Sequence, residues 1–467
     1  MDVSALTLSR VQFGFTVSFH IVFPSFTIGL AAWLAFLEAM SLATRRAVYR
    51  RLFDFWVRIF AIAFGLGVVS GIVMAFQFGT NWNELSRRTG PIQGPLLGYE
   101  TFTAFILEAT FFGVLMFGRS RVPRWAYLLS CLMISTGTSL SAFWILVNNS
   151  WMQHPTGFRV APDGMFNPED WLQILFNSVV WVRFPHMILA AYLTTAFCVS
   201  ATGAWYLLFR RNREEARAML DMGLRLAAVL VPAQLFMGHL VGGYVAQTQP
   251  SKIAAIEGRW RDEQPASETL FAIPDVAARQ NRFAITLPAP VGSLIDSGSS
   301  TAKEVGLESI PQDDWPPVLV PFFTFRVMVG CGVLMLLLAW VGAWRSLRGT
   351  VERGRWFLWP LAVSFPLPFV AILTGWYTAE VGRQPWVVYG QLRTADALTP
   401  FLTGPAVLGS LLLFAAVYAL IFLFGLYYIF GQLIRGPEPL PFDPGPATNP
   451  MRPLAMSGGS PTARPAE

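Results

Sequence analysis

Two carboxylates lie inside an apolar stretch of the chain, where an ionised side chain is costly. Glu100 and Glu108 occur in the segment GYETFTAFILEATFF, eight residues apart. On a regular α-helix this spacing places them about 12 Å apart along the axis and roughly 80° apart around it. Two such groups could relay protons or bind a metal, and a buried ion pair with an arginine from elsewhere in the chain would also explain them.

Two histidines also have apolar surroundings. His20 occurs in VSFHIVFP and His186 in RFPHMILA. A neutral imidazole at either place could bind iron or simply donate a hydrogen bond to a backbone carbonyl. The segment FRVMVGCG adds Arg326 and Met328. Histidine and methionine together are typical axial ligands of a low-spin electron-transfer haem, and a nearby arginine suits a haem propionate.

The small number of histidines excludes two classes of haem protein. The chain has four, whereas a haem–copper oxidase needs about half a dozen inward-facing histidines and a cytochrome b of the bc type needs histidine pairs on shared helices. We expect His154, in WMQHPTG, in an exposed loop. His239, in FMGHLVGGY, receives no catalytic role.

The composition predicts a membrane protein. Hydrophobic residues make up 54% of the 467 residues and charged residues 13%, which is more apolar surface than one soluble core can bury. The net charge of +6 could suit nucleic acid, but most arginines form short clusters between apolar runs, as in cytoplasmic membrane loops. We therefore exclude nucleic acid as a partner. The isolated cysteines Cys131, Cys198 and Cys331 argue against disulfides and a covalent c-type haem.

Nine segments are long and apolar enough to cross a bilayer, which takes about 20 residues. They comprise residues 11–41, 55–79, 95–118, 125–148, 177–209, 222–246, 318–344, 357–381 and 404–433. The first run has no basic region before it, so we interpret it as a retained span and not as a cleaved signal peptide. The predicted fold is an all-α integral membrane protein with nine transmembrane helices.

Arginine clusters follow every odd-numbered segment and fall on one side of the predicted membrane. The positive-inside rule therefore predicts an amino terminus outside and a carboxyl terminus in the cytoplasm. Residues 1–246 would carry six helices, 247–316 an outer loop, 317–434 three helices and 435–467 a disordered cytoplasmic tail rich in Pro, Gly and Ser. An outer loop of about seventy residues is unusually long, which suggests a function.

Five motifs, in this order, resemble subunit I of the cytochrome bd-type quinol oxidases, including the cyanide-insensitive branch. They are QFGTNW at 77–82, LSAFWILVNNSWMQ at 140–153, SKIAAIEGRW at 251–260, FRVMVGCG at 325–332 and GRQPW at 382–386. The resemblance covers essentially all nine predicted helices. It implies a terminal oxidase of the bacterial cytoplasmic (inner) membrane that oxidises ubiquinol or menaquinol and reduces O2 to water. Its cofactors would be haem b558, haem b595 and either haem d or a third b-type haem.

The resemblance also implies haem ligands. His186 and Met328 correspond to the ligands of haem b558. His20 corresponds to a ligand in the high-spin haem pair, Glu100 to a carboxylate at the same centre, and Glu380 to an axial ligand of one of its haems. Which of these three groups serves haem d and which serves haem b595 stays open.

Further residues correspond to positions around the haems. Trp376 is expected to help electrons pass between them, and Glu108 and Ser141 to form part of a proton route from the cytoplasm. Arginines expected near the haem carboxylates are Arg10, Arg326 and Arg383.

The outer loop resembles a short-loop quinol-binding segment, with Lys252 and Glu257 in the matching positions. Quinol oxidation releases protons, so a carboxylate can act as the base and an ammonium can stabilise the developing oxyanion. Protons released outside, while others are taken from the cytoplasm, would generate a proton motive force without pumping. Members of this family pair the subunit with a subunit II and often with small single-span subunits.

Two other functions compete with this prediction. In a secondary transporter, Glu100, Glu108 and Glu380 would bind protons or cations, but the sequence shows neither the internal repeats nor the broken helices typical of that class. A haem-binding electron carrier that never meets oxygen would need the His186–Met328 pair but not the further carboxylates.

Overall fold

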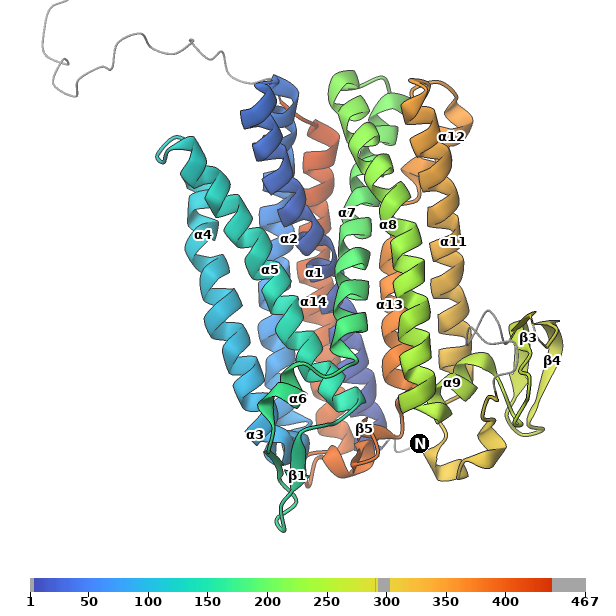
Figure 1. Ribbon diagram of the computed structural model, residues 1–467. Helices are drawn as coiled ribbons and strands as arrows, with labels where there is room; N and C mark the ends of the chain where they lie inside the picture. The colour runs from blue at the N-terminus through green and yellow to red at the C-terminus, as the bar shows by residue number, and fades with distance from the viewer. Residues whose placement is uncertain (1–3, 290, 293–302, 439–467) are drawn as a thin grey trace, which may run out of the picture.

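The computed structural model describes residues 4–289, 291–292 and 303–438. Within these ranges, nine helical segments are long and apolar enough to span a membrane, as the sequence predicts. They run side by side as one bundle (Figure 1). The expected tail lies outside the described residues from 439 onward, and so does part of the predicted outer loop.

The described helices are α1 (Ala5–Thr44), α2 (Ala47–Thr80), α3 (Asn83–Glu100), α4 (Ile106–Phe117), α5 (Arg124–Gln153), α6 (Trp171–Leu175), α7 (Val180–Leu208), α8 (Arg213–Thr248), α9 (Pro250–Glu257), α11 (Leu319–Leu347), α12 (Arg355–Ala362), α13 (Pro366–Val381) and α14 (Gly404–Arg435). Short turns are the π-helical η1 (Thr101–Phe105) and the 3₁₀-helical η2 (Leu307–Ser309), η3 (Gln312–Asp314) and η4 (Thr394–Ala397).

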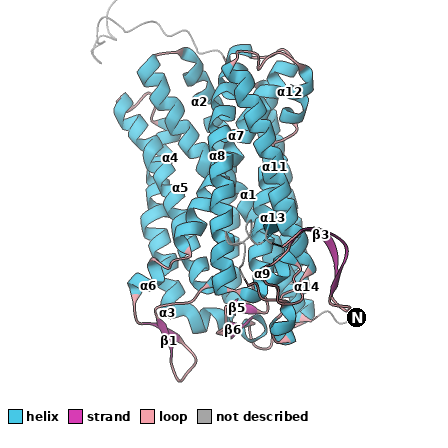
Figure 2. Ribbon diagram, turned by 45° about the vertical axis from the view of Figure 1, so that its right-hand side comes forward, coloured by secondary structure: helices cyan, strands magenta, loops and turns pink. Residues whose placement is uncertain are grey.

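Three antiparallel strand pairs connect helices, so the all-α prediction holds for the spans but misses these connections. They are β1 (Phe158–Val160) with β2 (Phe166–Pro168), β3 (Glu268–Asp275) with β4 (Gln280–Leu287), and β5 (Trp386–Val388) with β6 (Leu392–Arg393). All three lie toward the end of the bundle where α9 lies (Figures 1 and 2). The second pair belongs to the loop predicted at 247–316.

Most spans extend beyond the apolar runs that identify them. The first helix has 40 residues, or about 60 Å, whereas the hydrocarbon layer is about 30 Å thick. It begins at Ser4, whose side chain accepts a hydrogen bond from the Thr7 amide, and it ends where Arg45 adopts a left-handed φ of 56°. Polar ends of this kind carry no hydropathy signal.

The predicted span 357–381 is a broken helix, which corrects the expectation that the chain has none. Between α12 and α13 the helix stops at residues 363–365 and restarts at Pro366, as expected where proline lacks an amide proton. A second break separates α6 from α7. The α12–α13 break lies nearer one end of its span, and the resulting segment α13 carries Glu380.

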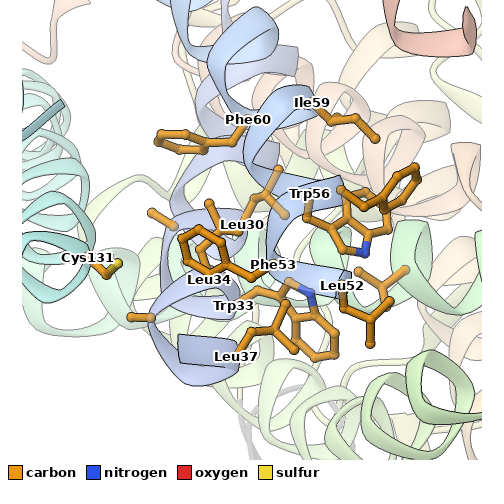
Figure 3. Close-up of a cluster of buried hydrophobic side chains, with 14 of the residues drawn as sticks. Leu30, Trp33, Leu34, Leu37, Leu52, Phe53, Trp56, Ile59, Phe60 and Cys131 are labelled. Carbon is orange, nitrogen blue, oxygen red and sulfur yellow. The ribbon is translucent and has the colours of Figure 1, made fainter. Parts of the chain in front are cut away.

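The largest apolar cluster among the described residues lies chiefly on α1, α2 and α5. Figure 3 shows Leu30, Leu34 and Leu37 of α1 meeting Phe53 and other large side chains of α2. Leu30, Leu37 and Phe53 have no exposed area. This core lies toward the end of the bundle opposite α9. The half of α1 that carries His20 lies outside it.

Candidate functional site

His186 lies on α7 against α8. Its Nε2 is 3.3 Å from Nε2 of Gln234, and a Cβ on Gly238 would lie 3.4 Å from its Cε1. Among the described residues, Nδ1 of His186 and Oε1 of Gln234 are buried without a hydrogen-bond partner. Because an unpaired buried polar atom is costly, the pair indicates a place that a bound group completes.

Met328 on α11 faces α13 near the same place. A Cβ on Gly375 would lie 2.8 Å from its Sδ, so any larger residue at position 375 would displace the thioether. One turn along α11, a Cβ on Gly332 would lie 3.3 Å from Cδ2 of Leu235, the residue that follows the glutamine beside His186. The same part of α8 thus contacts His186 and the turn of α11 that follows Met328. An imidazole and a thioether in one region between helices fit a low-spin haem.

His20 on α1 is oriented by α2. Its Nδ1 is 3.0 Å from the hydroxyl of Ser70, and that hydroxyl donates its single proton to the carbonyl oxygen of Leu66 at 2.8 Å or of Gly67 at 3.0 Å. When the hydroxyl proton goes to one of these carbonyls, Ser70 accepts the Nδ1 proton and Nε2 is left unprotonated. A Cβ on Gly71 would lie 3.1 Å from Cε1 of His20. An imidazole fixed in this tautomer fits an iron ligand.

Glu380 lies at the centre of a buried polar cluster at the end of α13. Its Oε1 accepts hydrogen bonds from Asn149 and Gln153 of α5, each at 3.0 Å. Arg383 donates to its Oε2 at 2.5 Å, and Nη2 of Arg183 lies 3.9 Å from Oε1. The opening turn of GRQPW therefore holds an arginine against this carboxylate.

Lys252 joins the cluster from α9. Its Nζ donates to Oε1 of Gln153 at 2.6 Å, and Gln249 donates to the same oxygen at 2.9 Å. Lys252 is 2% exposed. Burial lowers its pKa well below the ordinary value; the Glu380 carboxylate opposes this shift, and Arg383 and Arg183 add to it.

The cluster has more basic than acidic groups. It joins Arg183, Arg383 and Lys252 to the single carboxylate of Glu380. Burial lowers the pKa of Arg383, and Glu380 opposes that shift. Two guanidinium nitrogens of Arg383, Nε and Nη1, are buried without a partner among the described residues. Buried donors of this kind fit the propionates of a haem, because they would neutralise and satisfy its carboxylates.

Glu100 and Glu108 both face α5. Ser141 donates to Oε1 of Glu100 at 2.8 Å, and a Cβ on Gly137 would lie 2.9 Å from Cγ of Glu108. The π-helical turn η1 between them explains why the predicted 80° offset is wrong. A π turn accommodates one extra residue. The eight-residue separation therefore spans about two full turns, as seven residues do in a regular helix, and the two side chains lie on the same face.

Glu257 ends α9 and lies apart from the Lys252 amine. Arg259 approaches its carboxylate at 2.6 Å, and both side chains are almost fully buried. Glu257 lines a pocket of about 320 Å³ together with loop residues and with Thr269 and residues 278–281 of the β3–β4 hairpin. Lys252 is absent from this lining. The two residues predicted to handle one quinol thus have different surroundings.

Arg326 ties three segments together. Its guanidinium donates to the carbonyl oxygens of Leu270 at 3.0 Å and of Ile256 and Phe322 at 2.8 Å each, and also to that of Thr269. It therefore joins α11 to α9 and β3. The role expected for it beside a haem carboxylate stays a prediction.

The remaining candidate residues are not part of the hydrogen-bonded clusters described above. Arg10 is exposed on α1 and His239 is exposed on α8. Trp376 is half-buried beside Tyr377, whose hydroxyl lies 2.7 Å from that of Ser18 on α1. His154 is half-buried directly after α5, so the expectation of an exposed histidine is wrong.

Sequence reasoning missed five polar side chains that orient the predicted ligands. Two of them, Asn149 and Gln153, have a helical i, i+4 spacing within the motif LSAFWILVNNSWMQ, which could have indicated a common face. The charge of Arg183 inside an apolar run was a second signal. The others are Ser70 and Gln234, for which the sequence offers no comparable signal.

Comparisons with known proteins agree over nearly the whole chain. The model of the cytochrome bd terminal oxidase subunit I family matches residues 8–437. The chain is 33% identical to cytochrome bd ubiquinol oxidase subunit 1 of Bacillus subtilis, over 93% of this chain and 95% of that protein. It is also 33% identical to cytochrome bd-II ubiquinol oxidase subunit 1 of Escherichia coli, over 93% and 97%.

A solved structure has the same fold. The bd oxidase from Geobacillus thermodenitrificans superposes with a TM-score of 0.86 at 28% sequence identity, covering 94% of this chain and 100% of that one. The fold, the motifs and the family match therefore lead to one conclusion. The chain belongs to the family of subunit I of cytochrome bd terminal oxidases.

Proposed function

We propose that this subunit oxidises a membrane quinol beside α9 and reduces O2 to water at a di-haem site near α1, α3 and α13. The observation that carries the proposal is the buried cluster in which Gln153 joins Lys252 of the α9 segment to Glu380 of α13. It connects the proposed substrate segment to the proposed oxygen-reducing site. As a family member, the chain is a respiratory oxidoreductase subunit that spans the bacterial inner membrane several times and works with a subunit II.

Haems supply one-electron transfer and oxygen chemistry when bound. Residues proposed to hold them are His186 and Met328 for a low-spin haem, and His20, Glu100 and Glu380 for a high-spin pair. Arg383 has buried donors free for a propionate. Trp376 lies on the same helix as Glu380, one turn before it, which suits a place between haems. The types of haem follow from extraction, as described below.

Glu257 is the proposed base for quinol oxidation. Quinol loses two electrons and two protons on becoming quinone, so a carboxylate at the pocket wall can accept a hydroxyl proton. Arg259 holds this carboxylate in place at 2.6 Å. Lys252 would act from behind the pocket, through Gln153 and the cluster.

Glu108, Ser141 and Glu100 are the proposed carriers of protons toward the oxygen-reducing site. Ser141 already donates to Glu100, and Glu108 faces the same helix. We also propose that the amino terminus and α9 lie outside, because the arginine clusters gather at the opposite end of the bundle. Substrate protons released outside and protons taken up inside would then generate a proton motive force without pumping.

The first test is a dithionite-reduced minus air-oxidised absorbance spectrum of the purified complex, with the haems extracted and counted. We expect three haems, including a low-spin b-type haem. A red-shifted chlorin band would identify haem d, and three b-type haems would identify the cyanide-insensitive variant. A complex without a low-spin haem would overturn the proposed His186–Met328 site.

A second test separates quinol oxidation from oxygen reduction. We expect Glu257→Gln to lower quinol-driven O2 consumption by a factor of about 100 or more, the usual range for a lost general base. Oxidation of an artificial donor that bypasses the loop should stay near wild type. Glu308→Gln, at an exposed loop carboxylate paired with Arg261, is the matched control. Equal losses with both donors would remove Glu257 from quinol oxidation.

A further inference from the structure

The β3–β4 hairpin has an apolar outer face. Its exposed side chains include Leu270, Phe271 and Ile273 of β3 and Phe283 and Ile285 of β4, with exposed fractions of 45% to 81%. Phe271 pairs with Ile285 across the two strands, so apolar side chains are neighbours on this face. Single exposed apolar residues are common, but a contiguous group on one small sheet indicates a contact surface.

A bulge in β4 turns Phe283 outward. Between the pairs Phe271–Ile285 and Ile273–Arg282, β4 has one residue more than β3. Phe283 occupies this bulge with a φ of 52° and is 81% exposed. A left-handed φ is costly for a bulky aromatic residue, and strained positions of this kind are often functional. Exposure of the ring to water offers no compensation for that cost, whereas an apolar contact does.

The hairpin lies beside the bundle and not beyond its end. In Figures 1 and 2 it stands to the side of α11, whereas the β1–β2 hairpin extends past the helix ends. Arg326 fixes this placement, because it donates to the carbonyl oxygens of Thr269 and Leu270 of β3. Arg326 is seven residues after Leu319, the first residue of α11, or about 10 Å along the helix.

The aromatic residues of α11 indicate how deep this position lies. Trp340 and Trp344 are each 53% exposed near the basic end of the helix, where tryptophans mark the membrane interface. A helix crosses about 30 Å of hydrocarbon in about 20 residues. Counted back from these two tryptophans, the opposite boundary of the hydrocarbon layer lies near residues 320–324. Arg326 lies within about one turn of that boundary. The exposed side chains of Val320 and Phe323 there continue the exposed apolar surface of α11 toward its first turn.

We propose that the β3–β4 hairpin is an interfacial anchor that inserts Phe271, Phe283 and Ile285 into the lipid leaflet on the α9 side. Three observations support this: the apolar outer face, the bulge that turns an aromatic ring outward, and the attachment to α11 at the level of the hydrocarbon boundary. Aromatic and aliphatic side chains together are well suited to the region between headgroups and acyl chains. The anchoring does not depend on which substrate the subunit uses.

The anchor has a consequence for the neighbouring pocket. Residues 278–281 of the hairpin form part of the wall of the pocket that contains Glu257. A hairpin seated in the leaflet holds this wall at the membrane surface. If the proposed quinol oxidation is correct, the substrate can pass from lipid to pocket without crossing water.

The test is lipid-specific quenching of a fluorophore on the hairpin. The variants F283C and I285C, each labelled with a polarity-sensitive dye, are prepared in the intact complex in nanodiscs with and without lipids that carry a nitroxide near the headgroup. The control is V160C, at a 50% exposed position of the β1–β2 hairpin beyond the helix ends. Unsubstituted complex, treated with the dye, corrects for labelling of the native cysteines, two of which are buried.

We expect the dyes at positions 283 and 285 to have blue-shifted emission and to lose intensity with nitroxide lipids, while the dye at 160 shows neither effect. Dyes at 283 and 285 that match the control would show that the hairpin lies in water and would overturn the proposal. A blue shift without lipid quenching would show that another polypeptide covers the face, and would overturn it as well. Because both labelled side chains are exposed, the substitutions should not disturb folding.

Discussion

At His20, a single hydroxyl decides which imidazole nitrogen is available. Ser70 can accept the Nδ1 proton when its own proton goes to a backbone carbonyl of the same helix. Outer partners of this kind orient a ligand and raise its basicity. The sequence could identify His20 by its apolar surroundings, but it could not identify Ser70, which is fifty residues away and one of many serines.

Replacing Ser70 with alanine tests this arrangement. We expect S70A to weaken retention of the high-spin haem by a factor of about 10 to 100, as is typical when the hydrogen-bond partner of a metal ligand is lost. The measurement is the extracted haem content and the CO difference spectrum. S70T keeps the hydroxyl and should restore both. Equal loss in the two variants would assign Ser70 a packing role only.

Met328 allows a second test at the scale of one residue. We expect M328L to remove the low-spin character of the haem at His186, because leucine has a similar volume and no donor atom. Reduced-minus-oxidised spectra should lose the low-spin band, while CO binding at the high-spin site remains. An unchanged low-spin band would exclude Met328 as a ligand.

At the scale of elements, the sequence predicts the spans well and their irregularities poorly. Apolar runs identify all nine spans because each must cross the same thickness of hydrocarbon. The π turn η1 and the break before α13 depend on packing with neighbouring helices, and average hydropathy does not report packing. These two irregularities determine the directions in which the side chains of Glu100, Glu108 and Glu380 point. The sequence therefore identifies the three acids but does not predict their arrangement.

The close contact between α11 and α13 provides a prediction for a pair of helices. A Cβ on Gly375 would lie 2.8 Å from Sδ of Met328, so G375A should push the thioether away. We expect a shifted or weakened low-spin band with little change in CO binding. The control is G330A on α11, where a Cβ would have no neighbour within 4 Å and alanine favours helix. A normal low-spin band in G375A would contradict the assigned contact.

At the scale of the whole molecule, buried apolar surface stabilises the bundle, and exposed apolar surface is available for contact with its surroundings. The α1–α2–α5 core stabilises the half of the bundle away from α9 (Figure 3). By contrast, α14 exposes a long series of apolar side chains, among them Leu412, Leu413, Leu420 and Phe424. Such a surface must meet lipid or another subunit, which agrees with membership of a membrane complex.

The core allows a prediction of stability. Phe53 has no exposed area, and F53A should cost about 3–5 kcal/mol through lost burial and a new cavity. F36A, at a side chain that is 45% exposed, should cost far less. Thermal unfolding of the purified complex, followed by loss of the haem absorbance, measures both. Similar midpoints for the two variants would contradict the assignment of this cluster as the main core.

The burial of α9 has a consequence for how the subunit turns over. Residues 251–257 are all buried, and α9 is tied to α5 by Lys252 and Gln249 and to α11 by Arg326. Moving this helix would separate buried polar partners, which is expensive. The hairpin wall of the pocket is also held in place: Asn281 donates to the carbonyl oxygen of Gly258 and accepts from Trp260, and Arg326 donates to the carbonyl oxygens of Thr269 and Leu270. We therefore expect both walls of this pocket to stay in place during turnover, with no movement of the helices that carry the proposed haem ligands.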